Sequence, residues 1–418
     1  MKVEQRILNF EKLGFGLFIH FGLYSMLGKG EWYEQRYCYH SKPEFDHGIQ
    51  DKEYEALTDK FTVENLDFKK IIKMAYDAGI RYACLTTRHH DGFSLYDNSP
   101  LNTFDSLHSA CHRDIVREFV DACNEIGVVP FFYHTLIDWH FPMKDENGDM
   151  EKYLRYLEDS LKILCTKYGK IGGFWFDGNW YFKEGEFPLD RIFRLIRKYQ
   201  PDTMIINNTG MSHRGEKGTD EIDSVTFERG GNVTRISQNN DKYLAMEKCQ
   251  VFNNHWGYAK DDINIMSVEN VLDDLFVCRS NGSNLLFNVG PKGDGSIRLI
   301  EQGIFEELAT FNKYYGEVLR CKPSEVKTSN QQTFLLENEK NLYVIVKDTY
   351  TNGAFSEAKE EETITLSNVS RKVVSVETLD DHQKIDFKQD KDTISFKSKN
   401  FDYGINLIYR IYKLKYED

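Results

Sequence analysis

The sequence has few of the features that mark secreted disulfide scaffolds or membrane proteins. Its 418 residues include 8 cysteines and 8 prolines, and no two cysteines form a Cys-x-x-Cys pair. In a chain of this length such cysteines are expected to be free thiols of a reducing compartment. No stretch approaches the ~18 uninterrupted apolar residues of a membrane span, and residues 1–6 lack the apolar region of a signal peptide. We therefore expect a cytoplasmic protein, or a secreted one whose signal peptide has been removed.

Positive charge is also scarce. The 53 Lys and Arg residues are outnumbered by 66 Asp and Glu residues, giving a net charge of −13. Nucleic acids and anionic membranes require clustered basic residues, so neither is expected as a partner. The sequence also lacks a glycine-rich phosphate loop, a Gly-x-Ser-x-Gly elbow and a dinucleotide-binding fingerprint. A neutral or cationic substrate fits better, and the 29 Phe, 24 Tyr and 5 Trp residues suit either a core or a pocket that stacks on sugars.

Residues 1–320 alternate between apolar runs and amphipathic helical segments. Uninterrupted apolar runs are typical of strands buried on both faces. Alternation with helices implies a parallel sheet, and eight such units imply an α/β fold, a (β/α)8 TIM-like barrel. The sixth and seventh units show no obvious helix, so we expect an irregular barrel. The expected strands are residues 16–22, 82–87, 128–134, 172–177, 203–208, 223–228, 245–252 and 284–290.

The pattern changes from about residue 321 to residue 418. Short segments of alternating apolar and polar residues follow one another, separated by turn-type and charged residues. Segments of this kind predict a small antiparallel β-sandwich. The six expected strands are residues 333–336, 341–346, 362–366, 372–376, 393–396 and 405–411.

Polar side chains recur where the barrel strands are expected to end. The clearest case is Asp177, which follows the apolar run 172–176 and precedes Gly178. A carboxylate in such a place is costly unless it is paired or used, although an Asp can also simply cap the next loop or helix. The carboxyl ends of barrel strands form the floor of the active site. The set comprises His20, His89, His90, Tyr133, Asp177, Asn208, Glu228, Glu247 and Asn288.

Two reaction classes suit these residue types. A metal centre could use His20, His89, His90 and Asp91. However, adjacent residues of a strand point to opposite faces, so we expect His89 and His90 not to share an ion, and no metal. Two carboxylates in an aromatic, neutral-polar pocket are the groups that glycoside hydrolysis requires.

Several motifs, taken in chain order, resemble the α-L-fucosidases of glycoside hydrolase family 29. The resemblance covers residues ~10 to ~320 and implies a barrel, a C-terminal β-sandwich, a retaining mechanism, fucosylated oligosaccharides or glycoconjugates as substrates, and no cofactor. It is carried by Phe15–Ser25, Glu31–Tyr33, Leu85–Phe93, Trp175–Gly178 and Asn284–Pro291.

The resemblance also implies roles for individual residues. Asp177 would be the nucleophile, Tyr133 would line the pocket, and Trp256 would pack near the C5 methyl group of fucose. The residues expected to bind the fucose hydroxyls are His20, Glu31, Trp32, His89 and His90.

The acid/base is less well marked. Glu228 lies where many family members carry Thr-Pro-Glu, and Glu247 lies where many carry Trp-Glu-x-Cys, each with one departure from the motif. We favour Glu228 because Gly230 and Gly231 follow it, as in a loop that lines a pocket, whereas Glu247 lies earlier in its strand.

A further departure concerns residues 207–209, which are Asn-Asn-Thr where many members carry Asn-Asp-Arg. The missing Arg removes an expected electrostatic contact, which Arg214 or Arg229 could replace.

The sequence thus predicts a retaining exo-α-L-fucosidase with Asp177 and Glu228 as its catalytic pair. The same residues would also fit a transfucosylase or a related exo-glycosidase. A non-catalytic fucose-binding lectin is the alternative from another class, although a lectin would have no need of the carboxylates.

Overall fold

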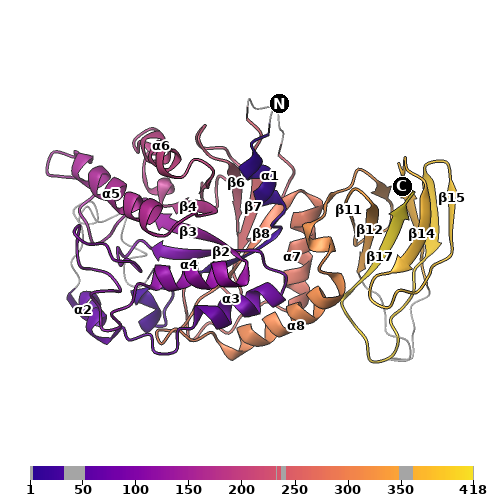
Figure 1. The fold of residues 1–418 in the computed structure, drawn as a ribbon, viewed down its shortest axis with the longest axis horizontal. Helices are drawn as coiled ribbons and strands as arrows, with labels where there is room; N and C mark the ends of the chain where they lie inside the picture. Colours follow the sequence, from indigo (N-terminus) through magenta and orange to yellow (C-terminus); the bar gives the residue numbers. More distant parts are fainter. Residues whose placement is uncertain (1–2, 33–51, 232, 237–241, 348–360, 418) are drawn as a thin grey trace.

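The computed structural model describes residues 3–32, 52–231, 233–236, 242–347 and 361–417. Eight parallel strands close into a barrel in sequence order, as the sequence predicts, and a separate β-structure follows it (Figure 1). The barrel strands are β1 (Phe15–Ile19), β2 (Tyr82–Arg88), β3 (Val129–Thr135), β4 (Gly173–Asp177), β5 (Met204–Asn207), β6 (Ser224–Glu228), β7 (Ala245–Gln250) and β8 (Ser283–Val289).

The barrel strands are apolar because both of their faces are covered. One set of side chains, including Phe18, Phe131 and Trp175, fills the barrel interior. The alternate set, including Leu17, Phe132 and Phe174, packs outward against the helices. Every residue of β1 and β2 is buried, which explains why these strands show no polar alternation in the sequence.

Helices surround the barrel, and several begin at capping side chains. Asp67, Asp114 and Ser267 each accept a hydrogen bond from the backbone N–H three residues later, at the starts of α3, α4 and α7. The helices are α1 (Gln5–Glu11), α2 (Lys52–Glu55), α3 (Phe68–Asp77), α4 (Ile115–Ile126), α5 (Glu151–Lys167), α6 (Leu189–Tyr199), α7 (Val268–Ser280) and α8 (Leu299–Tyr315). Short 3₁₀ turns lie at Leu23–Met26, Ala56–Lys60, Asn179–Tyr181 and Val318–Arg320.

The barrel lacks described helices in its fifth and sixth units, whereas the sequence predicts irregularity in the sixth and seventh. Residues 208–223, between β5 and β6, contain no helix, and neither do the described residues between β6 and β7. The seventh strand, in contrast, is followed by α7. The connection after β5 is therefore a loop, and its residues 210–212 line the site described below.

Two antiparallel sheets form the C-terminal β-sandwich. One has the order β10-β13-β16-β15 and the other β14-β17-β12-β11-β9. The strands are β9 (Lys322–Pro323), β10 (Lys327–Thr328), β11 (Thr333–Glu337), β12 (Asn341–Lys347), β13 (Thr363–Ser367), β14 (Val373–Thr378), β15 (Phe387–Asp390), β16 (Thr393–Lys397) and β17 (Tyr409–Tyr416).

The sandwich differs from the sequence-based expectation in two respects. The strand expected at residues 405–411 begins only at Tyr409, because Ile408 has a φ of +69°, which interrupts extended backbone. Three strands were not expected: β9 and β10 have two residues each, and β15 is a polar edge strand with no buried residue.

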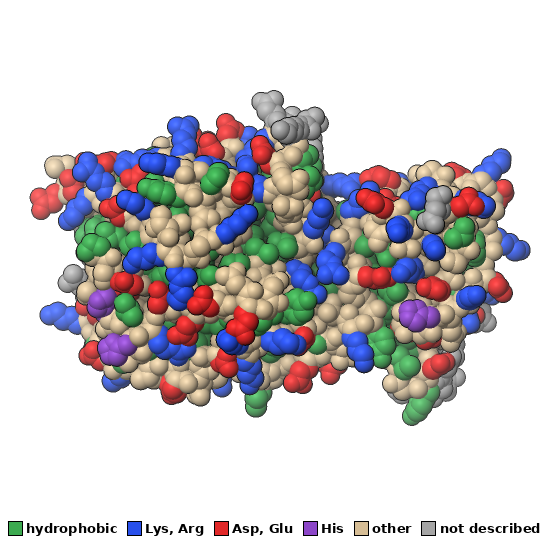
Figure 2. Space-filling view, in the orientation of Figure 1, with side chains coloured by type: hydrophobic (Ala, Val, Ile, Leu, Met, Phe, Trp, Pro, Cys, Tyr) green, Lys and Arg blue, Asp and Glu red, His purple; other side chains and the backbone are tan. Residues whose placement is uncertain are grey.

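The sandwich packs against α7 of the barrel. The rings of Phe276 and Tyr409 lie 4.8 Å apart, and Lys347 Nζ lies 2.7 Å from an Asp273 carboxylate oxygen. On the face shown in Figure 2, acidic and basic side chains are interspersed over both parts of the molecule. The seven described cysteines are all free thiols, and Cys38 lies outside the described residues. None of the helices in the described ranges is long and apolar enough to cross a membrane.

Candidate active site

A cavity of about 490 Å³ lies at the carboxyl ends of the barrel strands. Its base contains Phe18 and Trp175, rings that belong to the packed interior of the barrel. The cavity is thus blind at the bottom and open at the loops. Of the residues predicted from sequence, its lining contains His20, Trp32, His89, Tyr133, Asp177, Glu228 and Trp256.

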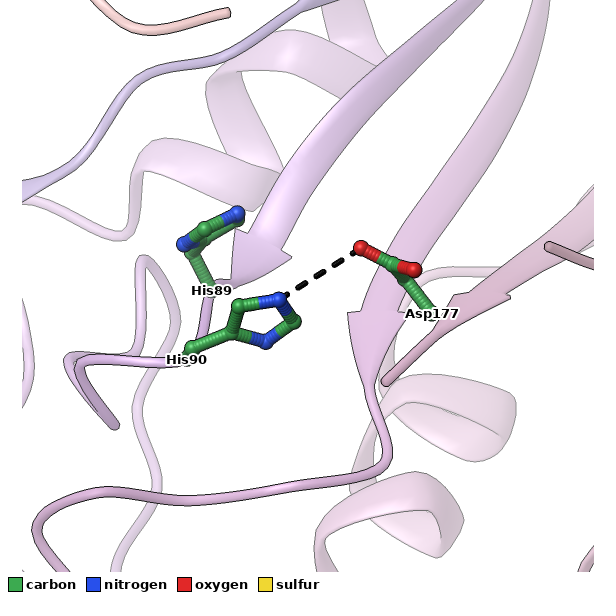
Figure 3. Close-up of side chains that lie close together, drawn as sticks. All are labelled: His89, His90 and Asp177. Carbon is green, nitrogen blue, oxygen red and sulfur yellow. Dashed lines mark ion pairs between the residues drawn. The ribbon is translucent and has the colours of Figure 1, made fainter. Parts of the chain in front are cut away.

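Asp177 ends β4 and is held by hydrogen-bond donors on both carboxylate oxygens. Tyr133 Oη donates to Oδ2 at 3.0 Å, and Trp180 Nε1 donates to Oδ1 at 2.9 Å. His90 Nε2 lies 3.5 Å from Oδ2 (Figure 3). Burial alone would raise the pKa of Asp177, but the contacts with His90, Trp180 and the Gly178 N–H outweigh it and lower the pKa. Asp177 is therefore ionised at neutral pH.

Glu228 ends β6 on the other side of the cavity, and its environment acts in the opposite direction. Burial and the nearby Asp177 charge raise the pKa of Glu228, against a hydrogen bond from Asn208 and the charges of Arg229 and Arg214. Two neighbouring carboxyl groups with pKa values displaced in opposite directions form the arrangement of a nucleophile and a general acid.

The spacing of the two carboxyl groups is limited by one side chain between them. Asn208 Nδ2 donates to Asp177 Oδ1 at 3.2 Å and to Glu228 Oε2 at 2.8 Å. These two oxygens are therefore no more than about 6 Å apart, the sum of the two distances. Retaining glycosidases have carboxyl groups roughly 5–5.5 Å apart and inverting ones roughly 6.5–9.5 Å. The upper limit on the distance between Asp177 Oδ1 and Glu228 Oε2 is therefore shorter than the carboxyl separation of inverting enzymes.

Glu247, the alternative acid/base, lies deeper in the barrel and does not line the cavity. It is fully buried and accepts hydrogen bonds from Tyr82 Oη at 2.6 Å and Trp175 Nε1 at 2.7 Å. Burial raises the pKa of Glu247 to about 7. Because the Trp175 ring lies at the base of the cavity, the geometry gives Glu247 a supporting position beneath that ring.

His20 is a neutral acceptor held in a fixed tautomer. Asn288 Nδ2 donates to the Trp256 carbonyl at 2.7 Å, so its Oδ1 accepts from His20 Nδ1, 2.6 Å away. Burial lowers the pKa of His20 to about 3. With Nδ1 protonated, the lone pair of Nε2 remains available to a hydroxyl group.

His89 and His90 both belong to the site, contrary to the expectation that they point to opposite faces. β2 ends at Arg88, so neither histidine follows strand alternation, and their ring centroids lie 4.2 Å apart (Figure 3). Burial lowers the pKa of His89 well below its usual value, and the ring stacks on Tyr133. His90 Nδ1 is paired with Thr135 Oγ1 at 2.6 Å.

His89, His90 and Asp177 also offer three ligand atoms that all lie within 4.8 Å of one another. A metal ion would have to displace the donors that Tyr133 and Trp180 direct at Asp177. The donor-rich surroundings already stabilise the ionised carboxylate, so the group is better suited to sugar hydroxyls than to a cation.

Trp32 and Trp256 line the cavity, and Glu31 supports the wall that Trp256 forms. Glu31 does not line the cavity; its Oε2 accepts from the backbone N–H groups of Trp256 at 3.0 Å and Gly257 at 2.8 Å. Trp32 stacks on Trp180 with ring centroids 5.5 Å apart. Glu31 thus fixes the segment that carries the Trp256 ring.

Two arginines near the cavity are candidates to replace the Arg that residues 207–209 lack. Arg229 lies over the Trp256 ring at 5.1 Å and lowers the pKa of both Glu228 and His20. It also has a φ of +50°, a strained conformation for a residue other than glycine. Arg214 Nε donates to the Glu228 carbonyl at 2.5 Å but is itself in an exposed position. Both charges lower the pKa of Glu228, but Arg229 is the less exposed of the two and also contacts the Trp256 ring.

Sequence reasoning missed the loop residues of the cavity, which are Trp180, Gly210, Met211 and Ser212. Trp180 could have been predicted from the sequence, because it follows Asp177 by three residues, a spacing at which a short turn brings two side chains together. The other three follow β5 in a connection without a helix, where no periodicity marks them.

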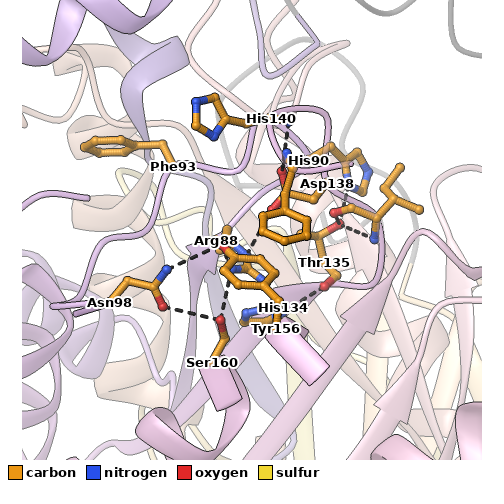
Figure 4. Close-up of polar contacts among 12 residues, drawn as sticks. Arg88, His90, Phe93, Asn98, His134, Thr135, Asp138, His140, Tyr156 and Ser160 are labelled. Atoms are coloured by element: carbon orange, nitrogen blue, oxygen red, sulfur yellow. Dashed lines mark hydrogen bonds and ion pairs between the residues drawn. The ribbon is translucent and has the colours of Figure 1, made fainter. Parts of the chain in front are cut away.

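A buried polar network behind His90 was also missed (Figure 4). Arg88 Nη1 donates to Tyr156 Oη at 2.6 Å and to Ser160 Oγ at 3.2 Å, and Arg88 Nε lies 3.8 Å from Asp138 Oδ2. The backbone N–H next to Asp138, that of Trp139, donates to the His90 carbonyl at 2.8 Å. The network therefore supports the loop segment from which His90 reaches Asp177.

The fold and the carboxylate pair define a glycoside hydrolase, and comparison with known proteins identifies its family. A family model described as alpha-L-fucosidase matches residues 3–317, so the chain belongs to the α-L-fucosidases of glycoside hydrolase family 29. Plasma alpha-L-fucosidase of Rattus norvegicus is 25% identical over 330 residues, covering 74% of this chain and 69% of that protein. Alpha-L-fucosidase of Dictyostelium discoideum is 26% identical over 335 residues, covering 70% and 68%.

Solved structures agree over the full chain. Alpha-L-fucosidase isoenzyme 1 from Paenibacillus thiaminolyticus superposes with a TM-score of 0.82 at 26% identity, covering 99% of both chains. A Bacteroides thetaiotaomicron enzyme of family 29, solved as a trapped covalent intermediate, has a TM-score of 0.80 at 23% identity, covering 100% of this chain and 97% of that one. At 23% identity, the likeness to the Bacteroides thetaiotaomicron enzyme is evidence for the fold alone.

Proposed function

We propose that the protein is a retaining exo-α-L-fucosidase that removes terminal fucose from glycans. The observation that carries the proposal is the pair formed by Asp177 and Glu228, bridged by one amide and displaced in pKa in opposite directions. The blind base of the cavity supports an exo mode, since a chain could not pass through it.

In the first step a carboxylate oxygen of Asp177 bonds to the anomeric carbon as the glycosidic C–O bond breaks. Glu228 transfers its proton to the departing oxygen. In the second step Glu228, now ionised, takes a proton from water, the water oxygen bonds to the anomeric carbon, and the bond to Asp177 breaks. Two inversions give net retention, and the proton returns to Glu228.

The remaining cavity residues hold the sugar. The free Nε2 of His20 accepts from a hydroxyl group, and His89 presents a buried Nδ1 that has no partner within the described residues. The Trp256 ring offers an apolar face, which suits the C5 methyl group of fucose. Glu31 acts on this wall through the Trp256 backbone.

The test is hydrolysis of an aryl α-L-fucoside and of a fucosylated oligosaccharide by the wild type and by Asp177→Ala, Glu228→Ala and Glu247→Gln, with and without azide. Asp177→Ala should be inactive and be rescued by azide with formation of β-fucosyl azide. Glu228→Ala should lose about 10²–10⁴-fold on substrates with sugar leaving groups, and its azide product should be the α-anomer.

Glu247→Gln is the matched control, because it alters a buried carboxylate on the neighbouring strand. Azide should not rescue it. If azide rescues Glu247→Gln with the α-anomer and leaves Glu228→Ala unchanged, the acid/base assignment is wrong. A wild type that binds fucose but cleaves neither aryl fucosides nor fucosylated oligosaccharides would be a lectin.

A further inference from the structure

Asn208 is the one side chain in the described site that touches both carboxyl groups. It follows β5 directly, is 3% exposed, and reaches between β4 and β6. Its Nδ2 group has two protons and two carboxylate acceptors, Asp177 Oδ1 at 3.2 Å and Glu228 Oε2 at 2.8 Å. Both donor positions of the amide are thus engaged.

The opposite end of the amide fixes its orientation. Asn208 Oδ1 accepts from the Gly210 backbone N–H at 3.1 Å and from Thr226 Oγ1 at 3.3 Å. Because the Gly210 N–H can only donate, the oxygen must face it, and the NH₂ group must face the carboxylates. All four hydrogen-bonding positions of the side chain are occupied, and the amide cannot rotate by half a turn without losing them.

From this geometry we propose that Asn208 is a positioning residue of the fucosidase reaction. It ties the nucleophile to the acid/base through one hydrogen bond to each carboxyl group, and the inference rests on the proposed function. Donation to an ionised carboxylate favours the charged form. The bond to Glu228 opposes burial and the Asp177 charge, and so limits how far the pKa of the acid rises.

The residue type at this position matters because an aspartate would differ from the asparagine in both charge and hydrogen bonding. An ionised aspartate could donate to neither carboxylate and would add a third negative charge between them. Like charges raise each other's pKa values. The asparagine of this chain therefore shifts the working pH range of the pair downward relative to the same site with a carboxylate.

The test compares Asn208→Leu, which removes the amide at similar volume, with Asn208→Asp. The acidic and alkaline limbs of the pH profile of kcat/KM report the two apparent pKa values of the coupled pair. Both limbs of Asn208→Leu should move upward by about one to two pH units, the shift that corresponds to losing one hydrogen bond to a charged group. The alkaline limb of Asn208→Asp should move further upward.

Thr226→Val is the matched control, since it removes a bond to the oxygen end of Asn208 and leaves the carboxylate contacts in place. Its limbs should coincide with those of the wild type. Unfolding temperatures of all variants show whether each is folded.

A second measurement covers variants too slow to assay. The pH dependence of binding of a fucose-configured iminocyclitol, followed by calorimetry, reports the same two ionisations without turnover. If the wild type is active and folded Asn208→Leu has the same two limbs as the wild type, the role of Asn208 is overturned. The proposed function is then unaffected. A wild type that neither cleaves a fucoside nor binds the iminocyclitol overturns the proposed function itself.

Discussion

Tyr133→Phe is the sharpest perturbation of the nucleophile that the structure offers. The hydroxyl donates to Asp177 Oδ2 at 3.0 Å, and the ring is 1% exposed, stacked on Trp175 and His89. Phenylalanine fills the same space, so the change removes one hydrogen bond and leaves no large cavity. Burial and the Asp177 charge raise the pKa of Tyr133 well above its usual value, which keeps the hydroxyl protonated as a donor.

The expected magnitude follows from the charge on the acceptor. A hydrogen bond to an ionised group contributes about 1.5–3 kcal/mol, and one pKa unit corresponds to about 1.4 kcal/mol. The pKa of Asp177 is lowered in the folded protein, and losing this donor raises it by about one to two units. Since Asp177 must be ionised to attack, the acidic limb of kcat/KM should move upward by that amount while the alkaline limb stays in place.

Tyr82→Phe is a control matched in chemistry and in burial. Tyr82 is likewise a buried barrel tyrosine, and it donates to Glu247 Oε2 at 2.6 Å. If Glu247 only supports Trp175, Tyr82→Phe should leave both limbs unchanged. An upward shift of the alkaline limb in Tyr82→Phe would instead identify Glu247 as the acid/base. An acidic limb that does not move in Tyr133→Phe would refute the role given to this hydrogen bond.

The depth of a side chain in the barrel could not be predicted from the sequence. Glu228 and Glu247 both lie on expected strands, and either could have reached the cavity. The register decides, because β6 pairs with β7 so that Glu228 lies opposite Cys249, two residues beyond Glu247. At roughly 3.3 Å per residue, Glu247 lies about 6–7 Å deeper. Register depends on tertiary pairing, which no local pattern encodes.

The directions of the His89 and His90 side chains could not be predicted from strand alternation either. Strand alternation holds only within a strand, and β2 ends at Arg88, one residue before His89. The expected strand, residues 82–87, already ended before both histidines, so the expectation about their faces was wrong because strand alternation was applied beyond the end of the strand. The barrel itself was predictable, because burial on both faces leaves continuous apolar runs in the sequence.

Two further predictions concern residues next to the catalytic pair. Arg229→Met keeps the stem on the Trp256 ring but removes a charge that lowers the pKa of Glu228, so the alkaline limb of kcat/KM should move upward; an unmoved limb would leave the missing family Arg without a replacement. Arg88→Met leaves Asp138 buried without its charged neighbour, which lies 3.8 Å away, and should lower the free energy of unfolding by about 3–5 kcal/mol in urea titrations at pH 7. Burial already raises the pKa of Asp138, and removing the guanidinium raises it further, so the variant carboxyl takes up a proton on folding. Its destabilisation must therefore be smaller at pH 5 than at pH 8, and a loss that does not depend on pH would show that Arg88 stabilises the network by packing on Tyr156 and not by its charge.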